Sequence, residues 1–115
     1  NLLLLVSDHV NGKFERVEGF DDSMGAQTKG MYEAPTAVKL ADGRWCLFAD
    51  FYGAGCAGQG YVPFVSDDLT KGVFTRADEA FHFPYGFKHG TILPITEEEY
   101  ERMLARDWTD VPDLR

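Results

Sequence analysis

Cysteine and positive charge are both scarce in this chain. Its 115 residues include two cysteines, and 11 lysines and arginines stand against 19 acidic residues. Neither Cys46 nor Cys56 belongs to a C-x-x-C pair or to a zinc pattern with histidine, which argues against a disulfide framework and a structural zinc site and favours a reducing compartment such as the cytoplasm. The net charge of −8 disfavours nucleic acids and anionic membranes as partners, whereas a neutral sugar is compatible with it.

Long apolar runs are missing as well. Residues 1–6 are apolar over too few positions to span a membrane and lack the basic region of a signal peptide, so we expect a buried strand there. Because the chain begins directly in this strand, we expect it to be a piece of a longer protein. The glycine-rich run 53–60 lacks the Lys-Ser/Thr pair and the following helix of a phosphate loop, and a loop at the rim of a sugar pocket fits it better than a nucleotide site.

What the chain does contain favours a β fold. Apolar residues make up 44% and aromatic residues 14%, which is enough for a packed core and argues against disorder. Turn signals at Asn11-Gly12 and Asp42-Gly43 predict hairpins, and Thr96 with Glu99 forms a capping box that predicts a short C-terminal helix, followed by a loose tail over 106–115. Alternating and β-branched segments predict strands over 2–7, 14–17, 36–40, 45–50, 61–66, 74–76 and 89–94.

Two segments of the chain resemble each other. Val6-Ser-Asp, followed by Gly-x-Phe-x-Arg ending at Arg16, recurs as Val65-Ser-Asp and Gly-x-Phe-x-Arg ending at Arg76. The two copies lie 59 to 60 residues apart. Self-similarity at a fixed spacing is typical of stacked β-units, propeller blades among them. The alternative is a chance likeness between two turns. The repeat also places Glu33 and His89 at equivalent positions, each just before the first strand of a new unit.

The segment Glu33-Ala-Pro resembles the Glu-Gly-Pro motif of glycoside hydrolase family 43, a family of five-bladed β-propellers that act on arabinose- and xylose-containing glycans. Segments 48–53 and 61–69 resemble the strands that follow this motif. Residues 88–100 resemble the Arg-His-Gly-Thr segment of the last blade. Ala34 in place of Gly and Lys88 in place of Arg depart from the pattern, and the resemblance covers Leu2 to Leu104.

The resemblance implies an all-β fold of antiparallel sheets: about two blades of a five-bladed β-propeller, with the end of one blade followed by blades that start near residues 32 and 88. It implies an inverting acid/base hydrolase with Glu33 as general acid. The base belongs to an earlier blade and has no match here, so the isolated chain would be inactive. With two blade faces open, we expect self-association or a missing N-terminal portion.

The resemblance also implies a set of ligand-binding residues. They would bind the carbohydrate without a required cofactor, although a calcium ion at the propeller axis could be held by His89 through water. Structural interpretations of the same residues stay open. Glu33 could simply hydrogen-bond a turn before Pro35, and His89 could be a core histidine. The chain could also be a non-catalytic carbohydrate-binding or structural propeller fragment. The predicted sugar-binding residues are Asp50, Tyr52, Lys88 and His89.

Overall fold

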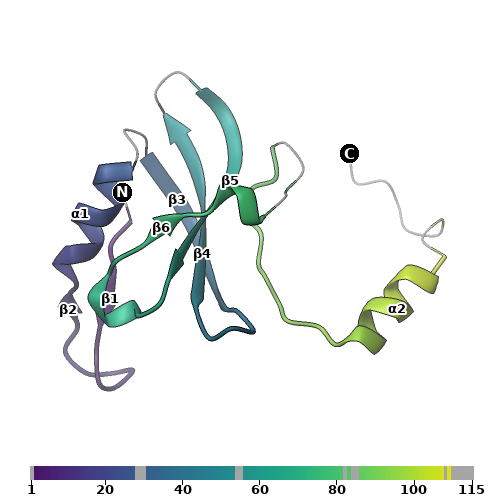
Figure 1. Ribbon diagram of the computed structural model, residues 1–115, viewed down its shortest axis with the longest axis horizontal. Coiled ribbons are helices and arrows are strands. Elements are labelled where there is room, and N and C mark those ends of the chain that lie inside the picture. Colours follow the sequence, from purple (N-terminus) through teal and green to yellow (C-terminus); the bar gives the residue numbers. More distant parts are fainter. Residues whose placement is uncertain are drawn as a thin grey trace.

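The computed structural model describes residues 2–27, 31–53, 56–81, 83, 86–107 and 109, without the side chains of 53 and 56–59. These residues form mostly antiparallel β-structure with a short C-terminal helix, which confirms the predicted all-β class (Figure 1). Among them, no helix is long and apolar enough to cross a membrane. The elements are β1 Leu5–Val6, β2 Glu15–Arg16, α1 Glu18–Gln27, β3 Met31–Lys39, β4 Trp45–Gly53, β5 Cys56–Ser66, η1 Leu69–Lys71, β6 Thr75–Arg76, η2 Asp78–Ala80 and α2 Glu97–Ala105.

The main sheet has four antiparallel strands in the order β3-β4-β5-β6, so each strand pairs with the next along the chain. The predicted turn at Asp42-Gly43 joins β3 to β4. Gly43 has φ 89°, and the Asp42 carboxylate accepts the N–H of Arg44 at 3.0 Å and pairs with its guanidinium. Glycine adopts a positive φ at no steric cost, which explains why this dipeptide marks a hairpin.

Strand β3 starts five residues earlier than predicted and contains a β-bulge. Glu33 pairs with Asp50 and Thr36 with Phe48, so Ala34 and Pro35 together face a single residue of β4. Ala34 has φ 45°, in the left-handed region. A proline ends most predicted strands because it lacks an N–H, but an edge strand tolerates one at a bulge.

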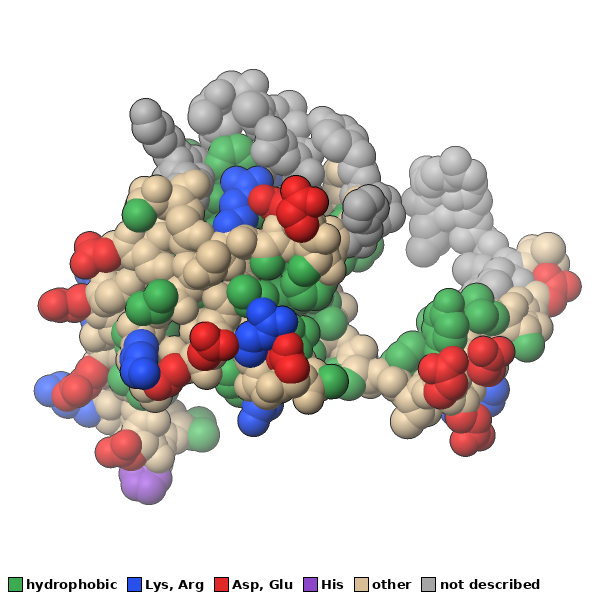
Figure 2. Space-filling view, in the orientation of Figure 1, with side chains coloured by type: hydrophobic (Ala, Val, Ile, Leu, Met, Phe, Trp, Pro, Cys, Tyr) green, Lys and Arg blue, Asp and Glu red, His purple; other side chains and the backbone are tan. Residues whose placement is uncertain are grey.

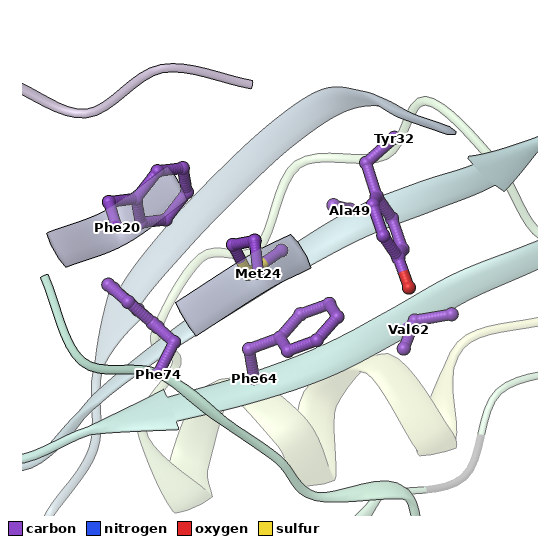
Figure 3. Packing of buried hydrophobic residues seen from close by; sticks show 7 residues of the cluster. All are labelled: Phe20, Met24, Tyr32, Ala49, Val62, Phe64 and Phe74. Carbon is purple, nitrogen blue, oxygen red and sulfur yellow. The ribbon is translucent and has the colours of Figure 1, made fainter. Parts of the chain in front are cut away.

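The sheet packs apolar side chains on both faces. One cluster gathers residues of α1 and the sheet, with Phe20 and Met24 of the helix over Phe64 and Phe74 (Figure 3). The opposite face carries Cys46, Phe48 and Tyr61, covered by Phe81, Phe83 and Ile92 from the chain after β6. Alternate residues of β4 therefore reach opposite faces, as the two-residue period of a strand requires.

Helix α1 was not predicted from the sequence. Two glycines among ten residues lower its intrinsic stability, so the helix depends on tertiary contacts. The Phe20 ring meets Phe74 edge-on, with ring centroids 5.4 Å apart. Ser23 exchanges hydrogen bonds with both backbone groups of Phe74 at 2.8 and 2.9 Å, while the Gln27 side chain bonds Phe74 O and the Arg76 N–H. The helix is thereby joined to the outer edge of β6.

The two copies of the sequence repeat fold as the same hairpin. In the first, Val17 N–H donates to Leu4 O at 2.9 Å; in the second, Ala77 N–H donates to Pro63 O at 3.0 Å. Ser7 and Ser66 each bond the backbone two residues ahead. This agreement favours a true repeat over a chance likeness of turns. The strand registers also match: Leu5 with Arg16 and Val6 with Glu15, against Phe64 with Arg76 and Val65 with Thr75.

Three predicted segments differ from the structure. Strand 2–7 shrinks to β1, and its leucines are not buried on both sides, because Leu2 and Leu4 pack on the core whereas Leu3 and Leu5 are exposed. Part of the glycine-rich run 53–60 is strand, since β4 ends at 53 and β5 begins at 56. The predicted strand 89–94 is wrong: this segment is irregular and pairs with no described strand. The predicted tail 106–115 lies almost wholly outside the described residues.

The capping box is confirmed. Thr96 Oγ accepts the N–H of Glu99 at 3.2 Å, and the Glu99 carboxylate accepts the N–H of Thr96 at 2.7 Å, which lowers the pKa of Glu99. The helix that follows, α2, lies apart from the sheet, with apolar side chains on one side and acidic ones on another (Figures 1 and 2).

Candidate functional site

The candidate site lies where three strands of the sheet meet the loop 86–90. Glu33 on β3 faces Asp50 on β4, and Asp50 faces Tyr61 on β5. Residues that face each other across antiparallel strands point to the same side, so the three form a row across one face of the sheet. The loop residue His89 joins this row, which brings together residues that are far apart in the sequence.

The imidazole of His89 lies between two carboxylates. Its Nε2 is 3.4 Å from Asp50 Oδ2 and 3.8 Å from Glu33 Oε1, and the backbone N–H of His89 donates to Asp50 Oδ2 at 3.1 Å. The exposed fractions of the three side chains differ sharply: 61% for His89, 44% for Glu33 and 0% for Asp50. Glu33 and His89 are therefore open to a ligand, whereas Asp50 forms the floor beneath them.

Tyr61 forms hydrogen bonds with the loop on both sides of His89. Its backbone N–H donates to Phe87 O at 3.1 Å, and its hydroxyl donates to Gly90 O at 2.5 Å. Burial, and then the neighbouring charge of Asp50, raise the pKa of the Tyr61 hydroxyl, which keeps it a hydrogen-bond donor. Sequence reasoning assigned Tyr61 to packing alone, because its position beside the loop follows only from the strand register.

The loop adopts a conformation that a side chain seldom tolerates. His89 has φ 50°, in the left-handed region that few residues other than glycine adopt, although histidine, asparagine and aspartate are found there more often than most. Strained backbone of this kind persists only where its surroundings hold it, and such positions cluster at functional sites. The contacts from Asp50 and Tyr61 supply that support here.

Asp50 is buried without full hydrogen bonding. Its Oδ1 has no partner among the described residues, and its Oδ2 is the atom that His89 approaches. A buried carboxylate is costly unless a donor or a positive group lies against it. The His89 backbone N–H supplies one such donor at 3.1 Å, and the His89 imidazole lies next to the carboxylate at 3.4 Å.

One donor atom from each of Glu33, Asp50 and His89 lies within 4.8 Å of the other two, a spacing that a single cation could bridge. Calcium takes six to eight oxygen ligands, however, and this set offers two carboxylates, one of them already bonded to a backbone N–H, and a nitrogen. The donor chemistry therefore suits the calcium ion expected from the resemblance poorly, and we assign it no part in the site's chemistry.

The two remaining predicted binding residues flank this cluster. Tyr52 follows Asp50 by two positions on β4, and Lys88 directly precedes His89; both are half-buried. The structure thus brings Glu33, Asp50 and His89 into one group and places Tyr52 and Lys88 beside it in the chain.

The family of the chain is shown by a comparison of its sequence with protein-family models. Residues 2–101 match the model of a probable glycosyl hydrolase domain related to glycoside hydrolase family 43. The chain belongs to this family of glycosyl hydrolase-related domains, and the resemblance drawn from Glu33-Ala-Pro and the segment after Lys88 is confirmed. No curated protein and no solved structure matches the chain.

Proposed function

We propose that Glu33 is the general acid of an inverting glycoside hydrolase that acts on arabinose- or xylose-containing glycans. The observation that carries this proposal is the placement of Glu33: its carboxylate is 44% exposed, stands at a bulge and lies beside an exposed imidazole in a glycosyl hydrolase-related domain. A general acid has to reach the leaving-group oxygen, so an accessible carboxyl held at a fixed place meets the first requirement.

The catalytic base has to come from outside this cluster. Inverting enzymes separate their two carboxyl groups by about 6.5–9.5 Å to leave room for a water molecule, whereas Glu33 and Asp50 bring oxygens within 4.8 Å. The carboxyl spacing of a retaining pair, about 5 Å, agrees better with this distance. The nucleophile of such a pair has to reach the sugar, however, and the Asp50 side chain is 0% exposed. This supports a base supplied by another segment of the complete protein.

We further propose that the fold is part of a five-bladed propeller. Blades are four-stranded antiparallel sheets, and β3–β6 is such a sheet. The hairpin β1–β2 would be the outer half of the preceding blade, because it repeats the β5–β6 hairpin. Segment 91–95, which is irregular here, would lead into the next blade, since Thr-Ile-Leu-Pro-Ile follows the left-handed His89 much as Thr-Ala-Val-Lys-Leu follows the left-handed Ala34. By this geometry His89 corresponds to Ala34, one residue from the match with Glu33 that the sequence repeat predicts.

The decisive experiment compares leaving groups. Glu33→Gln in the full-length protein should lower turnover of arabinan or xylan by about 10²–10⁴-fold. It should lower turnover of a 2,4-dinitrophenyl glycoside far less, because that leaving group departs without protonation. Glu15→Gln, at an exposed position on β2, is the matched control. Near wild-type turnover of the glycan by the Glu33 variant would show that Glu33 is not the acid.

A second candidate is carbohydrate binding without catalysis. The burial of Asp50, the second carboxylate of the cluster, favours it. In that case Tyr52, Lys88 and His89 would bind the sugar, and calorimetry would show binding of arabino- or xylo-oligosaccharides by a full-length protein that turns none of them over. Loss of sugar binding in His89→Ala, with binding retained in Glu33→Gln, would then identify the surface around His89 as the sugar-binding site.

A further inference from the structure

We propose that Asp50 is a positioning residue, which holds His89 by its backbone and by its ring and so directs the imidazole toward Glu33. The catalytic part of this inference rests on the proposed role of Glu33 as general acid. The mechanical part, that Asp50 fixes the His89 loop, stands on the contacts alone.

A single oxygen of Asp50 meets His89 at two points. Oδ2 accepts the backbone N–H at 3.1 Å and lies 3.4 Å from Nε2 of the same residue. The backbone N–H and the ring of His89 thus lie against the same atom, in a residue whose φ is 50°. The strained conformation and the position of the ring are therefore tied to one carboxylate.

Water cannot substitute for these contacts. The Asp50 side chain is 0% exposed, and its other oxygen has no hydrogen-bond partner among the described residues. The Tyr61 hydroxyl, which is close enough for the Asp50 charge to raise its pKa, donates to Gly90 O instead. Among the described residues, the contacts of the buried Asp50 carboxylate therefore go to His89, through its backbone N–H at 3.1 Å and its ring Nε2 at 3.4 Å.

The ring carries this influence to the accessible side of the site. Nε2 of His89, which lies 3.4 Å from Asp50 Oδ2, is also 3.8 Å from Glu33 Oε1. Asp50 is too buried to touch a sugar, so its role in the reaction is indirect, and its contacts assign that role to the position of His89. This assigns Asp50 a different role from the direct sugar contact expected from the sequence.

A double-mutant cycle in the full-length protein tests the catalytic part. Asp50→Asn keeps the size of the side chain and an acceptor for the His89 N–H but removes the charge, and His89→Ala removes the ring. We expect each single variant to lower kcat on an arabino- or xylo-oligosaccharide, whose leaving group needs protonation, by about 10-fold, with KM nearly unchanged in Asp50→Asn. The double variant should be no more than about twofold slower than the slower single variant, because contacting residues are not additive.

Multiplied effects, with the double variant about 100-fold slower than wild type, would overturn the proposal because they would mean that the two residues act independently. Asp67→Asn is the matched control, since it makes the same chemical change at an exposed aspartate after β5.

Limited digestion with a protease that cleaves after lysine tests the mechanical part without any need for activity. Asp50→Ala should speed cleavage after Lys88 by at least about 10-fold, as local opening governs the rate, while cleavage after the exposed Lys71 stays unchanged. Should Asp50→Ala unfold, so that all sites are cut alike, Asp50→Asn in the folded protein gives the same readout with a smaller increase.

Unchanged cleavage after Lys88 in a folded Asp50 variant would overturn the mechanical part, as would faster cleavage of the wild type in EDTA, which would mean that a metal ion holds His89. A wild-type protein that shows the expected digestion pattern but no turnover of any glycoside would refute the function proposed for Glu33 and leave the Asp50–His89 coupling supported.

Discussion

The carbonyl oxygen of Phe87 lies 2.8 Å from the point that a Cβ on Gly60 would occupy. Gly60 has φ 90°, so a side chain there would meet both a backbone penalty and a clash with the loop that carries His89. Gly43 has a nearly identical φ of 89° but nothing within 4 Å of its virtual Cβ. A comparison of substitutions at the two glycines therefore separates the free-energy cost of a positive φ from the cost of a clash with the loop.

We expect Gly43→Ala to lower the free energy of unfolding by about 1–2 kcal/mol, the cost of a left-handed alanine. Gly60→Ala should lower it by at least about 1 kcal/mol more, because the loop has to move away. Urea denaturation of both variants provides the comparison. Equal losses would show that the contact between β5 and the loop contributes little to stability.

Removal of the Ser23 hydroxyl should detach α1 from the sheet. The backbone of Phe74, a residue that is only 3% exposed, exchanges two hydrogen bonds with that hydroxyl. Ser23→Ala should therefore cost about 1–3 kcal/mol, the typical penalty for a buried polar group left unpaired, because the Phe74 N–H loses its partner while Phe74 O keeps the Gln27 side chain. Ser7→Ala, which removes a hydroxyl bonded within an exposed turn, serves as the control and should cost less than about 0.5 kcal/mol. Chemical denaturation followed by circular dichroism can resolve this difference.

Stability should fall in alkaline solution because of Cys46. Burial raises the pKa of its thiol from 9.0 to about 11, so the folded state keeps a proton that the unfolded chain loses. Unfolding then becomes easier as pH rises from about 9 to about 11, and we expect a loss of about 2 kcal/mol between pH ~8 and ~10.5. Cys46→Ala should show a smaller loss over the same interval in urea titrations. An equal slope in the two proteins would assign the pH dependence to other groups, such as Tyr61.

The isolated 115-residue chain should associate with itself. Leu3, Leu5 and Phe14 in the N-terminal hairpin are each about half exposed, and α2 adds Tyr100 and Leu104. Apolar surface of this kind is usually covered by a partner surface. Sedimentation velocity at micromolar concentration should show dimers or larger species that Leu3→Glu combined with Phe14→Glu shifts toward monomer. A strictly monomeric wild-type chain with a cooperative melt would contradict this expectation and weaken the two-blade interpretation.

The sequence was most informative where local chemistry determines structure. Asp42-Gly43 and the Thr96–Glu99 capping box specify their turn and helix start through contacts within a few residues. The prediction of a strand over 89–94 was wrong because a strand also needs a neighbouring strand to pair with, and a local sequence pattern does not reveal whether one is present. Helix α1 was missed for the related reason that its stability comes from Phe74, about 50 residues away.

The same distinction between local and long-range information applies to the candidate site. Glu33 and His89 could be found because each sits in a short motif with a family resemblance. The row formed by Glu33, Asp50 and Tyr61 could not, because it depends on the registers of two strand pairs and on a bulge that shifts one of them. The hold of Asp50 on His89 depends in addition on a left-handed backbone at a non-glycine residue, which no propensity predicts.

The bulge at Ala34-Pro35 also determines how the sheet ends. A sheet edge displays free N–H and C=O groups on which a foreign strand can be added, and this is a common route to aggregation. At β6 that edge is occupied by Ser23 and Gln27. On β3, Pro35 offers no N–H and Ala34 bends the backbone, so the edge is broken into two short pieces beside Glu33. The segment Glu33-Ala34-Pro35 thereby also keeps the Glu33 carboxylate from being covered by another chain's strand.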